Sequence, residues 1–141
     1  MKRVLLADEG ALARRMGTAY LEDLGCEVEA VSDGEAALAA IERRAPELIL
    51  AAAKLPGIGG VELCRRVKAH SEWRAIPFLI LTGALDAAPP TGGEAGDPDG
   101  GLRKPLSSAG LEPWLRRIEG KTPQELLVLA VHEAARGPNS E

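Results

Sequence analysis

Side chains that could do chemistry follow short apolar runs of the sequence. Asp8 and Glu9 come directly after the first such run, and Thr82 and Lys104 come after two later ones. If these runs are neighbouring parallel strands, their carboxyl ends meet at one edge of a sheet, where open α/β folds gather their ligands. Adjacent carboxylates repel each other unless a cation lies near them. These residue types therefore indicate a charged site at one sheet edge, provided that the elements of the chain bring them together.

The pattern of apolar residues gives the order of those elements. Short apolar runs alternate with segments of helical period, which is typical of βαβ units around a parallel sheet. The continuous apolar run over residues 48–53 is expected for a central strand that is buried on both faces. Strands are predicted over residues 4–7, 28–31, 48–53, 76–81 and around 102, and helices over 11–24, from a cap at Ser32 or Asp33 to Pro46, over 60–69 and over 107–119.

The first predicted helix has one apolar side and a marked end. Its apolar residues recur at helical spacing, as in a helix that packs by one face. Gly25 follows, and glycine commonly ends helices. The apolar side consists of Leu12, Met16, Ala19, Tyr20 and Leu24.

Composition limits the classes of protein that the chain can belong to. Its 141 residues suffice for one domain with a substantial core, and 45% hydrophobic with 27% charged residues is a globular balance. A net charge of −4 argues against nucleic acid as a direct partner. The amino terminus lacks the apolar stretch of a secretory signal, and no segment has the pattern of a membrane span. We therefore expect a cytoplasmic domain without a membrane or nucleic-acid partner.

The two cysteines do not form a metal-binding motif. Cys26 and Cys64 are far apart in the sequence and have no CxxC spacing. Isolated cysteines of a cytosolic protein are commonly small buried hydrophobic residues. We expect that role here, without a bound metal or a disulfide.

Residues 87–101 are rich in residue types that break helices. They contain three prolines and five glycines, and both types are unfavourable inside a helix. The alternation of strands and helices would otherwise require a crossover helix here. We predict a loop with a degenerate fourth helix, and the sequence leaves open whether it is a functional surface or a merely variable loop.

The last part of the chain carries a further amphipathic pattern. Thr122 can cap a helix, Pro123 suits the first helical position, and Glu125 completes a capping box. The apolar surface that follows needs a partner, which could be its own domain, a second subunit or a larger assembly. We divide the chain into a domain over residues 1–120 and a helical extension over 121–141. The apolar surface consists of Leu126, Leu127, Leu129, Ala130, Val131 and Ala134.

As a set, these motifs resemble the receiver domain of bacterial response regulators over about residues 4–119. The resemblance implies a flavodoxin-like (βα)5 fold with a parallel five-stranded sheet in the order 2-1-3-4-5. In such domains an acidic pair holds a magnesium ion, an aspartate on the third strand accepts a phosphoryl group from a histidine kinase, and a threonine and a lysine contact the phosphate. The matching motifs, in the right order, are Asp8-Glu9, Leu55-Pro56-Gly57 with Gly60, Thr82 and Lys104-Pro105.

The phosphate-accepting aspartate of the family is missing. Alignment of residues 47–57 places Ala52 at its position, and both neighbours, Ala51 and Ala53, are alanine as well. A register slip of one residue therefore brings no carboxylate to the strand end. A methyl group cannot accept phosphate, and a magnesium ligand is lost with the carboxylate, although a hard divalent cation prefers about six oxygens. We expect no catalytic residue, no cofactor, and weak or absent magnesium binding.

Two lysines could supply positive charge to such a site. Lys54 lies two residues beyond Ala52 in the sequence, and Lys104 can approach from the fifth strand. Our hypothesis is that one or both ammonium groups occupy the emptied metal and phosphate space beside Asp8 and Glu9. The alternative for Lys54 is that it points into solvent, as most lysines do.

Further departures from the family affect the surface that transmits its signal. Gly101 stands where the family usually carries an aromatic residue that changes rotamer on phosphorylation. Gly59 replaces a frequent aspartate, and Gly83 replaces a frequent alanine. The resemblance therefore implies a domain without the usual switching element.

The sequence favours a pseudo-receiver of two-component-type signal transduction rather than an enzyme. It would act by phosphorylation-independent protein–protein interaction with signalling proteins or with another copy of itself. One alternative is a phosphotransfer switch with a non-standard acceptor such as Thr82, Ser107 or Ser108. Another is a dimerisation module of a larger signalling protein, with a homodimer formed through the terminal apolar helix or the side of Trp114.

Overall fold

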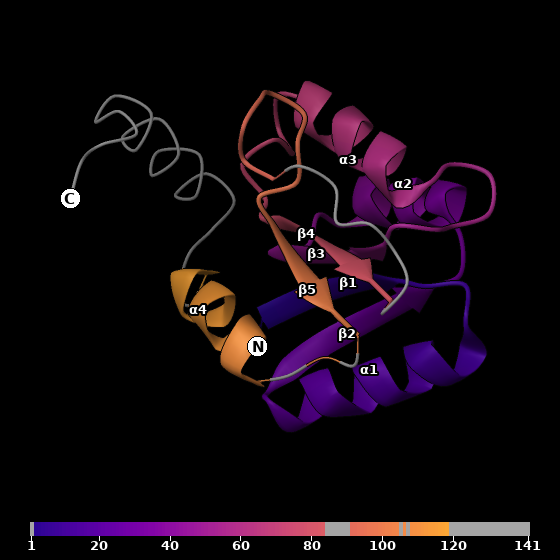
Figure 1. The fold of residues 1–141 in the computed structure, drawn as a ribbon, viewed down its shortest axis with the longest axis vertical. Helices are drawn as coiled ribbons and strands as arrows, with labels where there is room; N and C mark the ends of the chain where they lie inside the picture. Colours follow the sequence, from indigo (N-terminus) through magenta and orange to yellow (C-terminus); the bar gives the residue numbers. More distant parts are fainter. Residues whose placement is uncertain (1, 84–90, 105, 107, 119–141) are drawn as a thin grey trace.

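Five parallel strands form one sheet in the order β2-β1-β3-β4-β5 (Figure 1). The structure is a computed structural model that describes residues 2–83, 91–104, 106 and 108–118. The predicted flavodoxin-like strand order is confirmed, while the predicted extension over 121–141 lies outside the described residues. The elements are β1 (Lys2–Ala7), α1 (Ala11–Asp23), β2 (Cys26–Val31), α2 (Gly34–Arg43), β3 (Leu48–Ala52), α3 (Gly60–Ala69), β4 (Phe78–Thr82), β5 (Gly100–Arg103) and α4 (Ser108–Ile118).

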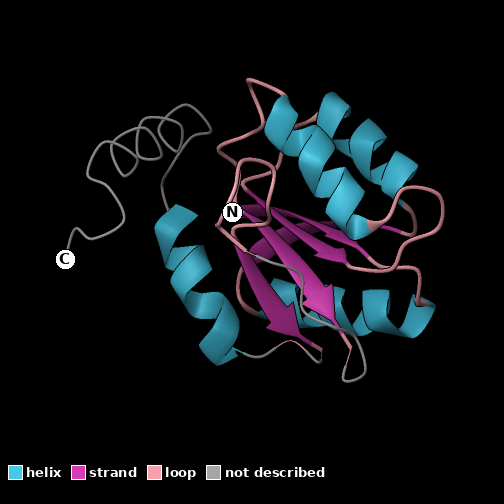
Figure 2. Ribbon diagram, turned by 45° about the horizontal axis from the view of Figure 1, so that its top comes forward, coloured by secondary structure: helices cyan, strands magenta, loops and turns pink. Residues whose placement is uncertain are grey.

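Helices cover both faces of the sheet. Figure 2 shows α2 and α3 on one side of the strands and α1 and α4 on the other. Each side has its own apolar cluster, one centred on Ile49 and Phe78 and the other on Leu50 and Leu79. Every residue of β3 and β4 is buried, because these central strands are covered on both faces. Such strands need apolar side chains on both faces.

The helix ends follow the local signals of the sequence. The Asp33 carboxylate caps α2 by accepting a hydrogen bond from the Ala36 amide at 2.7 Å. Gly25 follows α1 with a φ of 86°, a conformation that L-residues with a side chain rarely adopt. β2 begins two residues earlier than its apolar run predicts. β4 begins two residues later than predicted.

The apolar side of α1 packs on the sheet only in part. Tyr20 and Leu24 pack against the cluster that also contains Leu21. Leu12 and Met16 instead expose 65% and 58% of their surface. The spacing of apolar residues correctly predicts a helix, but Leu12 and Met16 are not part of its buried side.

Between β4 and β5, the described residues 91–99 form turns and bends and contain no helix. Asp99 anchors this segment, because its carboxylate accepts from the Phe78 amide at 2.8 Å and lies 2.6 Å from the Lys68 ammonium. The Asp99 amide in turn donates to the Phe78 carbonyl at 2.8 Å. An anchored turn thus leads the chain into β5 where the family pattern would have the end of a helix.

Both cysteines are buried and free, which confirms that they are small core residues. Burial raises the pKa of the Cys64 thiol to about 12, because the thiolate would lose its hydration in the core. Burial also raises the pKa of the Cys26 thiol. Neither residue is therefore suited to act as a reactive thiolate.

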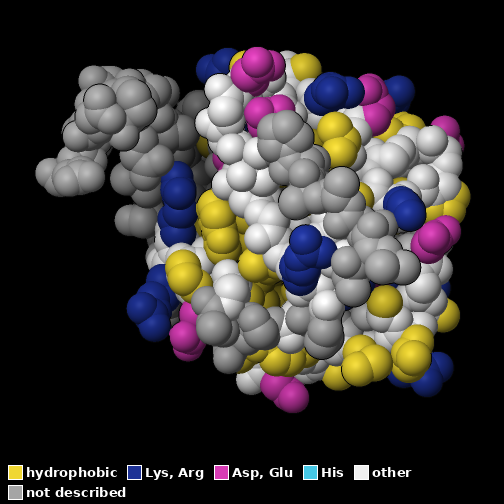
Figure 3. All heavy atoms as spheres, in the orientation of Figure 1, with side chains coloured by type: hydrophobic (Ala, Val, Ile, Leu, Met, Phe, Trp, Pro, Cys, Tyr) yellow, Lys and Arg dark blue, Asp and Glu magenta, His cyan; other side chains and the backbone are white. Residues whose placement is uncertain are grey.

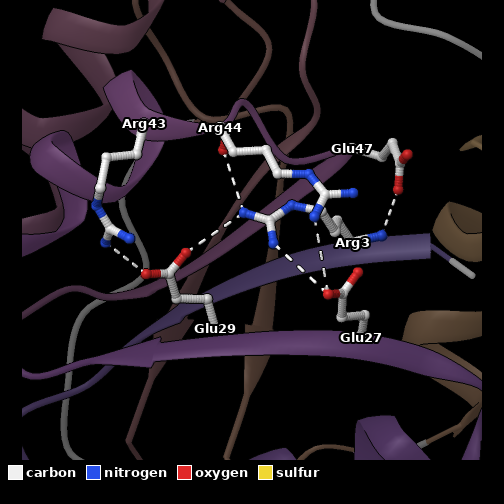
Figure 4. Close-up of polar contacts among 6 residues, drawn as sticks. All are labelled: Arg3, Glu27, Glu29, Arg43, Arg44 and Glu47. Atoms are coloured by element: carbon white, nitrogen blue, oxygen red, sulfur yellow. Dashed lines mark hydrogen bonds and ion pairs between the residues drawn. The ribbon is translucent and has the colours of Figure 1, made fainter.

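A network of ion pairs joins β1, β2 and the end of α2 around Arg3 (Figure 4). The Arg3 guanidinium lies 3.3 Å from the Glu29 carboxylate and 4.0 Å from that of Glu27. Arg43 approaches Glu29 to 2.6 Å, and the Arg3 amide donates to the Glu47 carboxylate. Since Glu47 directly precedes β3, the network stabilises three strands at the edge of the sheet opposite to Asp8.

The Glu29→Gln substitution should lower stability in a pH-dependent way. The hydrogen bond from Arg43, followed by that from Arg3, holds the Glu29 pKa below its ordinary value of 4.5. This contribution is therefore present above the unfolded-state pKa and is lost as the pH falls through the folded-state pKa. Urea unfolding should show a loss of about 0.5–1 kcal/mol at neutral pH and a smaller difference in acid. An equal loss for Glu22→Gln, an exposed carboxylate of α1, would contradict the assignment.

The turn from β3 into α3 depends on close backbone contact at Gly60. A Cβ atom there would overlap the Ala52 carbonyl oxygen and would lie 2.8 Å from the Ile80 side chain. At the neighbouring Gly59, the nearest atom would lie at an ordinary 3.5 Å. A side chain at Gly60 would therefore displace either the end of β3 or the start of α3.

Gly60→Ala should accordingly destabilise the fold, whereas Gly59→Ala should not. We expect Gly60→Ala to lower the free energy of unfolding by about 1–3 kcal/mol, because the overlap involves backbone atoms that cannot rotate away. Urea unfolding of the two variants provides a matched comparison. Similar values for both would show that the turn relaxes without cost.

Candidate functional site

Asp8 is the buried acid of the candidate site. It follows β1 at the carboxyl edge of the sheet, and only 4% of its surface is exposed. Its amide donates to the Val31 carbonyl at 3.0 Å, and its carboxylate accepts from the Gly10 amide at 3.0 Å. The Arg14 guanidinium donates to the Asp8 carbonyl at 2.7 Å. These contacts fix the carboxylate at the point where the chain enters α1.

Lys104 supplies a positive charge to this carboxylate. Its ammonium nitrogen lies 2.6 Å from Asp8 Oδ2, and about a third of its side chain (34%) is exposed. The Lys104 amide donates to the Thr82 carbonyl at 2.9 Å, which extends the β4–β5 pairing to the position of the lysine. The backbone therefore aims the lysine at Asp8, and the two side chains form a charge-assisted pair at the sheet edge.

Ala52 and Thr82 end the two strands between Asp8 and Lys104. Ala52 is the last residue of β3 and Thr82 the last of β4, and each exposes 3% of its surface. Ala52 pairs with Leu81 across the two strands. The structure thus brings Asp8, Ala52, Thr82 and Lys104 to one edge of the sheet, where β3 ends in a methyl group.

The other predicted residues lie farther out. Glu9 is exposed, and Lys54 is exposed in the loop between β3 and α3. Gly101 is exposed in β5 opposite Ile80, where an added Cβ would meet ordinary contacts of 3.6 Å or more. Ser108 begins α4, whereas Ser107 lies outside the described residues.

Both oxygens of the Asp8 carboxylate already have partners, since Oδ1 accepts from Gly10 and Oδ2 lies against Lys104. Among the residues that the structure describes, no group of three or more His, Cys, Asp or Glu side chains could hold a metal ion. The same part of the chain has no helix long and apolar enough to cross a membrane. Chemically, the site is a pair of opposite charges whose carboxylate has a partner at each oxygen.

The contacts of Gly10 and Arg14 with Asp8 are features that sequence reasoning missed. The glycine two residues after the aspartate is a possible signal, because an aspartate side chain often accepts from the amide two residues on. The Arg14 contact has no signal in the sequence, since it depends on the direction in which α1 leaves the sheet.

One known protein family matches most of this chain. The family, described as response regulator receiver domain, matches residues 4–113. The chain belongs to this family. The receiver domain predicted from the motifs is therefore confirmed, and the protein is a receiver of the two-component response-regulator kind.

Relatives of this receiver domain include longer regulators. The chain is 30% identical over 132 residues to the DNA-binding response regulator MtrA of Mycolicibacterium paratuberculosis. This match covers 92% of the chain and 57% of MtrA. It is 31% identical over 130 residues to the phosphate regulon transcriptional regulatory protein PhoB of Rhizobium meliloti. This second match covers 89% of the chain and 57% of PhoB. The chain thus spans little more than half the length of these relatives.

Solved structures agree with the fold. Chemotaxis protein CheY4 of Vibrio cholerae has a TM-score of 0.72 and 30% identity, over 84% of the chain and 98% of CheY4. The receiver domain of a sensor histidine kinase from Pseudomonas aeruginosa, which has a magnesium ion coordinated in its active-site cleft, has a TM-score of 0.68 and 26% identity. That match covers 84% of this chain and 98% of the other.

The Asp8–Lys104 pair should be energetically coupled. Lys104→Gln leaves a buried carboxylate without its counter-charge, and we expect a loss of about 1–3 kcal/mol in unfolding free energy, moderated by the partial exposure of the lysine. In the Asp8→Asn, Lys104→Gln double variant, the loss should be smaller than the sum of the single losses by about 1–2 kcal/mol. Additive losses would mean that the pair contributes no interaction.

Proposed function

We propose that this receiver domain is a pseudo-receiver, which signals by protein contact rather than by phosphorylation, and that it is not an enzyme. The observation that carries the proposal is the buried methyl group of Ala52 at the end of β3, a strand that lies between β1 and β5 in the sheet. Phosphoryl transfer to a receiver requires a nucleophilic oxygen aligned with the donor. A carbon-bound methyl group has no lone pair with which to attack phosphorus.

The buried hydroxyl group at this sheet edge does not favour the phosphotransfer alternative. Thr82 exposes only 3% of its surface at the end of β4. A phosphorylated side chain carries about −1.5 to −2 charges and three oxygens that need hydrogen-bond donors. Such a group would have to be accommodated where Thr82 is now enclosed, so we prefer the contact-driven function.

We further propose that magnesium binds weakly or not at all. The donor set is a poor fit for the ion, because both Asp8 oxygens are engaged and position 52 has no side-chain oxygen. An ammonium 2.6 Å from one of these oxygens also repels a divalent cation. Lys104 thus takes the place of an external cation and holds this edge of the sheet in one arrangement.

The proposed partners are signalling proteins or a second copy of the chain. The net charge of −4 disfavours direct binding of the domain to nucleic acid. The relatives named as DNA-binding regulators are longer than this chain, so an output domain in a larger protein or complex is compatible with the proposal. In either case the receiver would contribute a fixed contact surface.

The decisive experiment compares the native chain with Ala52→Asp. After incubation with acetyl phosphate and magnesium, intact-mass spectrometry should show no phosphoryl adduct on the native chain, because position 52 offers no nucleophilic oxygen. Ala52→Asp should acquire one adduct. The matched control is Ala52→Asn, because asparagine has nearly the volume of aspartate but no nucleophilic carboxylate, and this variant should remain unmodified.

Two results would contradict the proposal. A phosphoryl adduct on the native chain would establish another acceptor. Failure of a folded Ala52→Asp variant to be modified would show that residue 52 alone does not account for the loss of phosphorylation. Circular dichroism and urea unfolding of each variant establish that it is folded.

A further inference from the structure

A cavity of about 420 Å³ lies between α1 and the segment that joins β5 to α4. Its volume lies in the range of sites that take a small ligand or a group of side chains. The wall is mostly apolar, and the Asp8–Lys104 pair forms part of it. Side chains that line it include Leu12, Met16 and Tyr20 of α1, together with Leu81 and Leu106.

The rim of this cavity carries the exposed apolar residues of α1. Leu12 and Met16 are four residues apart, so they lie on the same face of the helix one turn from each other. They expose 65% and 58% of their surface, respectively. Figure 3 shows hydrophobic side chains gathered over α1 along the lower edge of the molecule. A single exposed apolar residue is ordinary, but an adjacent pair beside an apolar cavity indicates a contact surface.

Tyr20 gives a second indication that this surface is incomplete. Its ring lines the cavity, and its hydroxyl oxygen is buried without a hydrogen-bond partner among the described residues. A buried hydroxyl without a partner costs free energy and is uncommon in native proteins. A polypeptide segment in the cavity could supply both apolar contacts and a polar partner.

The chain itself has a segment of suitable composition and length. α4 is 11 residues long and ends at Ile118, and the helix predicted from the cap at Thr122 runs over residues 122–136. At 1.5 Å per residue, α4 is about 16 Å long and the predicted helix about 22 Å. A short connection over residues 119–121 favours two antiparallel neighbours. A helix that returns along α4 would therefore reach the first turn of α4, next to Leu106 and the cavity.

We propose that the cavity beside α1 is the docking site of residues 122–136 of the same chain. The apolar stripe of this segment includes Leu126, Ala130 and Ala134, which recur every four residues as expected for a helix laid on a groove. The covalent connection favours this occupant over a separate molecule, because a short linker gives an effective concentration of the order of millimolar. The docked segment would cover Leu12 and Met16.

Disulfide trapping in the full-length chain tests this proposal. One variant combines Met16→Cys with Ala130→Cys, which places a thiol at the cavity rim and another on the apolar stripe. The matched control combines Arg15→Cys with Ala130→Cys, because Arg15 is exposed on α1 but does not line the cavity. Oxidised glutathione is added at micromolar protein concentration, and non-reducing electrophoresis with intact mass follows the products. The native cysteines are buried, and the native chain is treated in parallel.

We expect the Met16→Cys, Ala130→Cys variant to form an intramolecular disulfide about tenfold faster than the control, as docking raises the local thiol concentration. Equal rates for the two variants would overturn the proposal, because an undocked tail would reach both positions alike. Disulfide-linked dimers as the main product would also overturn it and would assign the cavity to a second copy. This test is independent of phosphorylation, so its outcome is separate from that of the proposed function.

Discussion

The ion pair between Asp8 and Lys104 is the interaction on which the site of this receiver domain depends. A carboxylate with 4% exposure is costly unless a cation and hydrogen-bond donors accompany it. Here the cation is a side chain of the domain, held 2.6 Å away by a strand whose pairing with β4 continues to the lysine amide. Position 52 carries a methyl group, so it has no second carboxylate that would compete for the same ammonium.

The fold explains why these side chains meet although they are far apart in the sequence. In a parallel sheet every strand ends at the same edge, so Asp8 after β1, Ala52 on β3 and Lys104 after β5 are neighbours by topology. The close contact of Gly60 with the Ala52 carbonyl fixes the turn that follows β3. At the opposite edge, the charges around Arg3 join β1, β2 and the entry to β3, which orients the strands that carry the site.

The proposed loss of the acceptor would alter what this domain can contribute to signalling. A phosphorylated receiver changes state because added charge biases a two-state surface. In this chain, Gly101 lacks the aromatic side chain that the family uses, and the described residues before β5 form anchored turns. The exposed apolar residues of α1 offer another kind of control, in which a surface is either covered or available. Such control needs no chemistry at the strand ends.

The sequence by itself determined the family, the strand order and the absence of a carboxylate from residues 51–53. These follow from short-range patterns: apolar runs of strand length, the capping residue Asp33, the helix-ending Gly25, and three successive alanines that leave no register with a carboxylate. Only the tertiary structure decided that Lys104 rather than the exposed Lys54 lies against Asp8, that Arg14 binds the Asp8 carbonyl, and that Leu12 and Met16 remain outside the core. The periodicity of apolar residues specifies which face of a helix is apolar. It does not specify which residues of that face the rest of the fold covers. Likewise, residue type specifies that a lysine is charged, whereas the direction of the strand that carries it selects its partner.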